Sequence, residues 1–268
     1  MRRRLSLAGW LLLLLALGAA VVAQPQPAES SVPAWDGTLR RIRLPILMYH
    51  YISEPPPDAD VYRIDLSVPP SLFRQHLEYL RDGGYTPVGL EDLYAALQTG
   101  AALPDKPVVL TFDDGYEDNY TNAWPLLREF GFTGTFYVMT SGPDTGNSGY
   151  MTPQQLAEMA AGGMQIESHS RDHPDLRGRD GDFLVYQLLG AQESIAAWTG
   201  HTPYQFAYPA GVYDEAVLAM LRSLHVQTAV TTQNGALHTT DAPLELPRLR
   251  IRNTTDVPTL AALLATNS

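Results

Sequence analysis

The 268-residue chain contains no cysteine, so neither a disulfide nor a lipid on an N-terminal cysteine is possible. Its stability must therefore come from packing. Basic residues are also scarce, with 18 Lys and Arg against 29 Asp and Glu, which gives a formal net charge of −11. This balance argues against nucleic acid and anionic membrane surfaces as main partners, and it is compatible with neutral or cationic ligands.

Residues 1–23 are typical of a secretory signal peptide. Three arginines at positions 2–4 precede an apolar run over 11–22, and small residues at 21–23 offer a cleavage site. An uncleaved membrane anchor is the alternative, because the run is almost long enough to span a bilayer. Cleavage would leave 15 basic and 29 acidic residues, a net charge of −14, and would place the protein in the bacterial envelope, as in the periplasm, or outside the cell. With the segment removed, no stable membrane insertion is expected.

The rest of the chain predicts a linker and one catalytic domain. Residues 24–39 are rich in proline and serine and read as a linker, and the domain is expected over residues 40–268. Five prolines predict an extended loop over residues 54–70. About seven alternating strands and helices predict an α/β barrel with parallel strands rather than an open sheet. The expected strands are 44–51, 108–112, 132–139, 164–168, 204–208, 226–231 and 248–251, and the expected helices are 71–80, 90–97, 119–130, 153–161, 181–198, 213–224 and 257–264.

The central feature is the strand at residues 108–112, which leads directly into Asp113, Asp114 and Gly115. Carboxylates are costly to hold near a core unless they are paired or bind a metal. An ordinary Asp-Asp-Gly turn is the simpler alternative. Because parallel strands open onto one face at their carboxyl ends, side chains that follow other strands should converge on this pair.

Two histidines four residues apart, His169 and His173, follow the strand at 164–168. This spacing on a helical turn places both imidazoles on one side, where they could bind one ion. One carboxylate of the Asp pair would complete three ligands and leave a position for water, and the second would serve as general base. Zinc lowers the pKa of such a water toward ~7. Solvent-facing histidines with no ligand role are the alternative.

The motif TFDDG at residues 111–115 and the motif HSRDH at 169–173 resemble two signature motifs of the polysaccharide deacetylases, carbohydrate esterase family four. FAYPAG at residues 206–211 resembles a third, and further likeness extends from residue 45 to residue 251. The segments 48–50, 84–87 and 229–232 resemble those of a subgroup of exported members that act on N-acetylglucosamine polymers. The resemblance implies a distorted (β/α) barrel, a divalent metal with Zn²⁺ as the expected ion, and hydrolysis of an N-acetyl amide of a polysaccharide to acetate and free amine.

The resemblance also implies roles for individual residues. It makes Asp113 the general base and gives the metal three ligands, Asp114, His169 and His173. The backbone N–H of Ala210 would help to hold the developing oxyanion, a role that needs no polar side chain. His50, at the end of the first strand, and Tyr208, in the third motif, are expected to contact the substrate.

Three departures from the family pattern leave open questions. Ala207 stands where many members have an arginine that orients the base, and either Arg248 or Arg250 could replace it. Those two arginines alternate with Leu249 on one strand, so they share a face, and the sequence does not choose between them. A solvent-facing edge is the alternative for both.

The other two departures concern the acetyl pocket and the general acid. No tryptophan follows the third motif, since the chain has only Trp10, Trp35, Trp124 and Trp198, so the pocket wall must be built differently. No late Leu-x-His motif supplies the acid either, and His238 is an outside candidate. Two other functions stay open: a glycan-binding protein without catalysis, and a deacetylase of a non-sugar amide. Loops 54–70 and 140–150 are expected to select the substrate.

Overall fold

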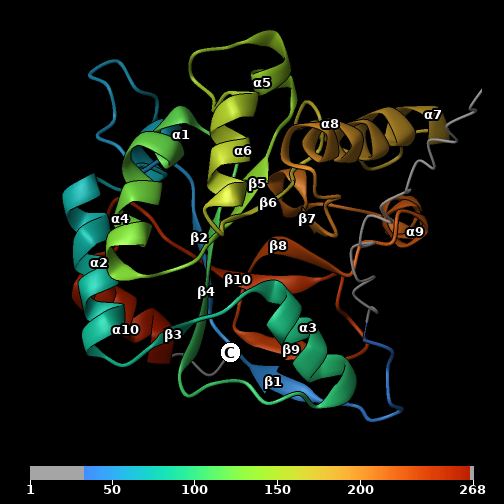
Figure 1. Ribbon diagram of the computed structural model, residues 1–268, viewed down its shortest axis with the longest axis horizontal. Helices are drawn as coiled ribbons and strands as arrows, with labels where there is room; N and C mark the ends of the chain where they lie inside the picture. The colour runs from blue at the N-terminus through green and yellow to red at the C-terminus, as the bar shows by residue number, and fades with distance from the viewer. Residues whose placement is uncertain (1–32, 266–268) are drawn as a thin grey trace, which may run out of the picture. The chain divides into compact units, whose positions relative to one another are not determined.

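The computed structural model describes residues 33–265 (Figure 1). The predicted signal peptide and residues 24–32 of the predicted linker lie outside the described residues. The described end of that linker is tied to the fold, because the N–H of Asp36 donates to the carbonyl of Gln98 at 3.0 Å. Within residues 33–265, no helix is both long and apolar enough to cross a membrane.

In this part of the chain, seven parallel strands form a closed barrel, which confirms the predicted fold. They pair in the order β2-β10-β8-β7-β6-β5-β4, and β4 pairs with β2 to close the ring. Because the strands run in one direction, their carboxyl ends surround a single mouth. The strands are β2 (Ile46–Tyr49), β4 (Pro107–Phe112), β5 (Thr135–Val138), β6 (Gln165–Ser168), β7 (Gln205–Ala207), β8 (Thr228–Asn234) and β10 (Leu246–Arg250).

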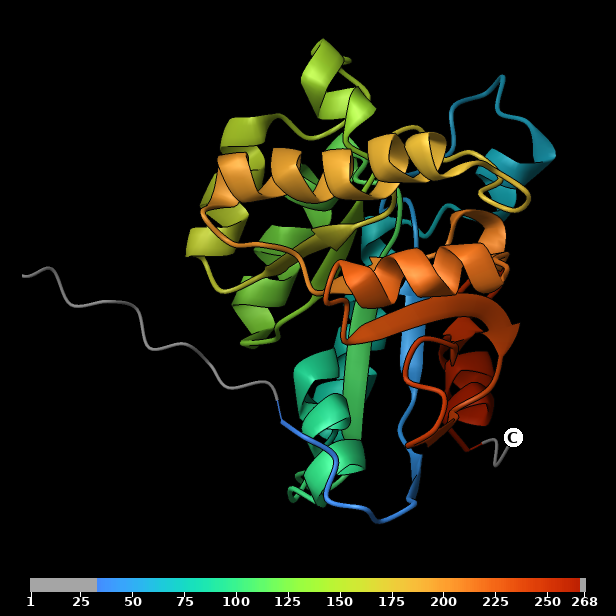
Figure 2. The ribbon, with the colours of Figure 1, turned by 90° about the vertical axis from the view of Figure 1, so that its right-hand side faces the viewer.

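Helices connect the strands and cover the outside of the barrel (Figures 1 and 2). Their ends carry ordinary capping chemistry: the side chains of Thr152 and Asp214 cap the N-termini of α6 and α9, and left-handed Gly100 and Gly131 end α3 and α4. The main helices are α2 (Pro70–Asp82), α3 (Leu90–Thr99), α4 (Trp124–Phe130), α6 (Pro153–Ala161), α8 (Gly190–Thr199), α9 (Glu215–Ser223) and α10 (Val257–Ala265).

Some elements differ from the prediction. The proline-rich stretch 54–70 is not entirely extended, because Asp60 caps a short helix, α1 (Val61–Asp65). The expected helices 119–130 and 181–198 each contain a π-helical turn, η1 (Asn119–Ala123) and η2 (Val185–Leu189). The pattern also missed short elements: β1 (Arg41–Arg43), its antiparallel partner β9 (Leu237–Thr239), β3 (Thr86–Pro87), α5 (Ser141–Thr145) and α7 (Gly181–Leu184).

Strand side chains alternate between the barrel interior and the surrounding helices. On β4, Leu110 and Phe112 belong to an outer core with residues of the surrounding helices, whereas Val109 belongs to a separate core that joins residues of other strands to α3. The inward face therefore continues through Thr111 to Asp113. This alternation sends the first acid of the pair into the barrel mouth.

The same alternation orients the other strands that end at the mouth. On β10, Leu249 packs in the outer core, so Arg248 and Arg250 face inward. On β7, Ala207 packs inward, whereas Phe206 and Tyr208 pack outward in a third core with α9 residues.

Candidate active site

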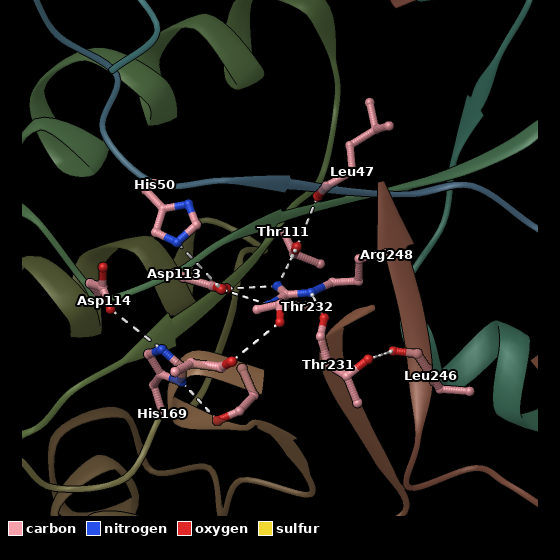
Figure 3. Close-up of polar contacts among 12 residues, drawn as sticks. Leu47, His50, Thr111, Asp113, Asp114, His169, Thr231, Thr232, Leu246 and Arg248 are labelled. Atoms are coloured by element: carbon pink, nitrogen blue, oxygen red, sulfur yellow. Dashed lines mark hydrogen bonds and ion pairs between the residues drawn. The ribbon is translucent and has the colours of Figure 1, made fainter. Parts of the chain in front are cut away.

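Asp113 and Asp114 follow β4 and direct their carboxylates to different partners (Figure 3). The N–H of Asp113 donates to the carbonyl of Tyr49 at 3.0 Å, which continues the pairing of β4 with β2. The backbone then turns through the left-handed region, with φ of 74° at Asp114 and 79° at Gly115. A Cβ at position 115 would lie 3.0 Å from Cγ1 of Val138, so this turn requires glycine.

Arg248 holds Asp113 from inside the barrel. Its two terminal nitrogens donate to the two carboxylate oxygens of Asp113 at 2.7 and 2.6 Å. The remaining guanidinium donors reach the hydroxyl of Thr111 and the carbonyl of Thr231, each at 3.0 Å. Arg248 is fully buried and Asp113 is only 2% exposed, so this is a bidentate charge pair removed from water.

This pairing sets the charge state of Asp113. Burial alone would raise the pKa of its carboxyl group, but the charge and hydrogen bonds of Arg248, together with His169 and His50, hold the pKa below its usual range. Asp113 is therefore a carboxylate at neutral pH, in the form that can accept a proton. The structure decides between the two arginines that the sequence left open. The guanidinium of Arg248 reaches Asp113, whereas that of Arg250 forms no hydrogen bond with it.

Asp114, His169 and His173 form a compact cluster beside this pair. Nε2 of His169 lies 3.4 Å from Oδ1 of Asp114, and Nε2 of His173 lies 3.8 Å from the same oxygen. The three atoms lie within 4.8 Å of one another. Burial would raise the pKa of Asp114, but the hydrogen bond to His169 and the nearby histidines hold that pKa well below its usual range.

A backbone contact fixes the orientation of His169. Its Nδ1 lies 2.7 Å from the carbonyl oxygen of Ala207, which can only accept, so Nδ1 carries the proton. In the neutral imidazole Nε2 is then the unprotonated nitrogen and is directed at the cluster, which is the arrangement of a metal-bound histidine. Burial lowers the pKa of His169, but the carboxylates of Asp114 and Asp113 outweigh it and raise that pKa, so without a metal Nε2 can hold a proton and donate it to Asp114. Ala207, at the position where the resemblance leads us to expect an arginine, thus contributes its carbonyl group to the site.

The segment from His169 to His173 is a loop, so the prediction of a helical turn there is wrong. Ser170 and His173 have φ of 66° and 55°, in the left-handed region that a helix does not use. The hydroxyl of Ser170 accepts from the N–H of His173 at 3.1 Å and holds the loop closed. The two imidazoles still meet, with ring centroids 4.8 Å apart.

The chemistry of the three donors fits a divalent metal. Two neutral imidazole nitrogens and one carboxylate oxygen, converging from the ends of two strands, are the ligand types of a catalytic zinc site. Asp114 is ionised and the contact of Nδ1 with Ala207 leaves Nε2 of His169 as the ligand atom, so an ion would need to displace at most a proton from Nε2. Among residues 33–265, this is the only cluster of three histidine and acidic side chains close enough to share an ion.

His50 also lies at the mouth, beside Asp113 (Figure 3). It follows β2 on the inward face and is 8% exposed, with Nε2 3.9 Å from Oδ2 of Asp113. Burial lowers the pKa of its imidazole, although Asp113 and Asp114 act in the opposite direction. The ring is therefore neutral at neutral pH, and it is the histidine that the structure brings to the base.

Two residues selected from the sequence lie away from this cluster. The ring of His238 bonds to the carbonyl of Leu44 at 2.8 Å, at the start of β2, whereas the mouth lies beyond its end. His238 is therefore not placed to act as general acid. The hydroxyl of Tyr208 donates to the carbonyl of Leu244 at 2.8 Å in the third core, outside the barrel, so this side chain does not face a substrate at the mouth.

Ala210 lies in the turn that follows β7. It adopts a left-handed backbone, with φ of 54°, and its carbonyl accepts from the hydroxyl of Thr232 at 3.2 Å. Gly211 follows with φ of 75°, and a Cβ there would lie 2.2 Å from Oγ1 of Thr232. The turn is thus locked against the end of β8.

Three stacked tyrosines stand beside Asp114. The rings of Tyr51 and Tyr116 are 3.6 Å apart and nearly parallel, and Tyr150 stacks on Tyr116 at 5.4 Å. Burial and the nearby carboxylate of Asp114 raise the pKa of Tyr116 far above its ordinary value, so the wall is uncharged. Sequence reasoning missed this wall, although Tyr51 and Tyr116 each follow a strand end and a site residue.

Comparison with known proteins agrees with this geometry. A family model described as polysaccharide deacetylase matches residues 100–229, a range that contains the acid pair and both cluster histidines but not Arg248. YxkH of Bacillus subtilis (strain 168), provisionally named a polysaccharide deacetylase, is 32% identical over 85% of this chain and 78% of its own length. The poly-beta-1,6-N-acetyl-D-glucosamine N-deacetylase of Escherichia coli (strain K12) is 30% identical over 53% of this chain, but this match spans 23% of that enzyme.

A solved structure extends the similarity to the whole barrel. The deacetylase PplD of Streptococcus pyogenes, in complex with acetate, aligns with a TM-score of 0.78 and 29% sequence identity. The alignment covers 85% of this chain and 100% of that one.

Proposed function

The chain belongs to the polysaccharide deacetylase family, hydrolases of N-acetyl amide bonds, and from this premise we propose that it is a metal-dependent N-deacetylase. Its substrate would be an N-acetylglucosamine-containing polysaccharide of the cell envelope or the surrounding medium. Water would add to the acetyl carbon, the amide C–N bond would break, and acetate and a free amine would leave.

One observation carries this proposal: the metal cluster and the buried base share a single barrel mouth. Asp114, His169 and His173 would hold the ion, with Zn²⁺ as the expected metal. A bound divalent ion would supply polarisation of the acetyl carbonyl and a lowered pKa for a nucleophilic water. Asp113, held by Arg248, would stand beside that ion as an acceptor for the proton of the water.

The position of His50 supports a route for the second proton transfer. The leaving nitrogen must gain a proton as the C–N bond breaks, and His50 is neutral in the resting site because burial lowers its pKa. It would therefore have to accept a proton first. Asp113, 3.9 Å away and protonated by the water, is the acid that could supply it. In this route the proton would pass from the water to Asp113, then to His50, and finally to the leaving amine.

Other groups at the mouth would serve orientation. The N–H of Ala210, in the locked turn after β7, would donate to the oxyanion that develops on the acetyl oxygen. The wall of Tyr51, Tyr116 and Tyr150 would exclude water on the side of Asp114 and take the place of the missing tryptophan.

The predicted signal peptide supports an exported location, in the cell envelope or outside the cell.

Acetate release from three polymers tests the proposal. We expect the metal-loaded protein to release acetate from at least one of peptidoglycan, chitin oligomers and β-1,6-linked N-acetylglucosamine polymer, with a matching gain of free amines. Bound metal without acetate from any of them would favour a glycan-binding role. Acetate from a small non-sugar amide alone would favour the third possibility, a deacetylase of non-sugar amides.

A further inference from the structure

Arg250 lies at the mouth of the barrel and has no role in the arrangement described above. It is two residues beyond Arg248 on β10 and shares its inward face, because Leu249 between them packs outward. It pairs in register with Met48 of β2, two residues before His50. The guanidinium of Arg250 therefore lies closer to solvent than that of Arg248, which holds the base.

The other arginines on this side of the mouth are each compensated by an acid. Arg248 pairs with Asp113, and Arg252 pairs with Asp65. Arg63 is linked to Asp118 through the hydroxyl of Ser53, which accepts from Arg63 at 2.8 Å and donates to Asp118 at 2.6 Å.

Arg250 differs from these arginines. Among residues 33–265, its guanidinium has no ion pair within 4.0 Å and no hydrogen bond, although the side chain is partly buried. Burial and the charges of Arg252 and Arg248 lower its pKa, so its surroundings disfavour the cation. The acids nearest to it, Asp113 and Asp65, already bind other arginines.

An uncompensated, partly buried guanidinium at a substrate mouth is an anion-binding group. Guanidinium binds carboxylates in a bidentate fork, a stronger contact than a neutral hydrogen bond to a sugar hydroxyl. The chain is otherwise acidic, with a net charge of −11, so general attraction of anions does not account for this cation. The contact must be local and directed.

Resting on the proposed function, we propose that Arg250 binds a carboxylate of the sugar substrate next to the acetamido group at the metal. The preferred substrate is then an N-acetylated glycan whose sugar units carry a carboxylate. A lactyl ether on the ring carbon beside the acetamido carbon provides this chemistry, and so does an adjoining uronic acid.

The test compares two polymers that differ only in the carboxylate. One is peptide-free glycan strands that contain N-acetylmuramic acid, and the other is the same strands after reduction of the carboxylate to an alcohol. Wild-type protein should show a kcat/KM for acetate release that is roughly tenfold or more higher on the carboxylate form, carried mainly by KM. A glycan of alternating N-acetylglucosamine and uronic acid tests the second source of the carboxylate.

The variant Arg250→Met should remove this preference and bring the two kcat/KM values together. Arg41→Met, an exposed arginine on β1 beyond the opposite end of β2, changes the charge equally and should keep the preference. Equal kcat/KM on both forms for the wild type, or a preference that survives Arg250→Met, would overturn the inference. Failure of the proposed function would look different, because no glycan would then yield acetate.

Discussion

Replacing Asp113 with asparagine should lower kcat by roughly 10²–10⁴-fold while the protein still binds its metal. The amide keeps the size of the side chain but cannot accept a proton from water, whereas the ligands Asp114, His169 and His173 remain unchanged. Acetate release at saturating substrate, with metal content measured on the same sample, would show the two effects separately. The change also leaves Arg248 opposite a neutral group, so folding must be checked by thermal unfolding.

Asp118→Asn is the matched control for this experiment. Asp118 also lies after β4, but it bonds to Ser53 and not to the base or the metal cluster. The Asp118→Asn variant should have a kcat within a few fold of that of the wild type. If metal-loaded Asp113→Asn retained activity near the wild type, Asp113 would not be the base.

Replacing Arg248 with methionine should lower the free energy of unfolding by about 3–5 kcal/mol at neutral pH. The cost arises because the carboxylate of Asp113 would stay buried without its partner, not because the pair itself is strongly favourable. Urea unfolding of the two proteins measures the difference. The double variant Asp113→Asn/Arg248→Met removes both charges and should lose less stability than the sum of the single variants.

The same substitution has a pH signature with a defined sign. Arg248 holds the pKa of Asp113 below its unfolded value of about 3.9, so its stabilisation is complete above that value and is lost as pH falls through the folded pKa. In Arg248→Met, burial becomes the dominant influence and the pKa of Asp113 should rise. The acid limb of the kcat/KM profile should then move to higher pH, and Arg248→Lys should restore part of the shift. An unmoved acid limb would mean that another group sets the charge of Asp113.

Sequence reasoning could locate the site because its strongest signals are local. The acid pair follows a run of apolar residues and the two histidines follow a short strand, and the parallel barrel brings the ends of these strands together. The choice between Arg248 and Arg250 was beyond the sequence, since both share one face. Which of them reaches Asp113 depends on the register of β10 against β2 and of β2 against β4, which is a non-local property.

The other errors of the sequence-based prediction also have physical causes. The strands of a parallel barrel are buried on both faces, so hydrophobicity did not show that Tyr208 points outward. The left-handed backbone at Ser170 and His173 involves residues with no strong preference for it, so the loop had no signature. His238 lies within β9, which pairs with β1 outside the barrel, and this pairing is also non-local.

The central claim is that acetate release requires a metal held by Asp114, His169 and His173. The most direct measurement is the rate of acetate release as metal-free protein is titrated with Zn²⁺, with bound metal counted in parallel. The account predicts negligible release without metal and a rate that rises in proportion to bound ion up to one per chain. Full activity in the metal-free protein, or one bound ion per chain with no acetate from any glycan, would contradict it.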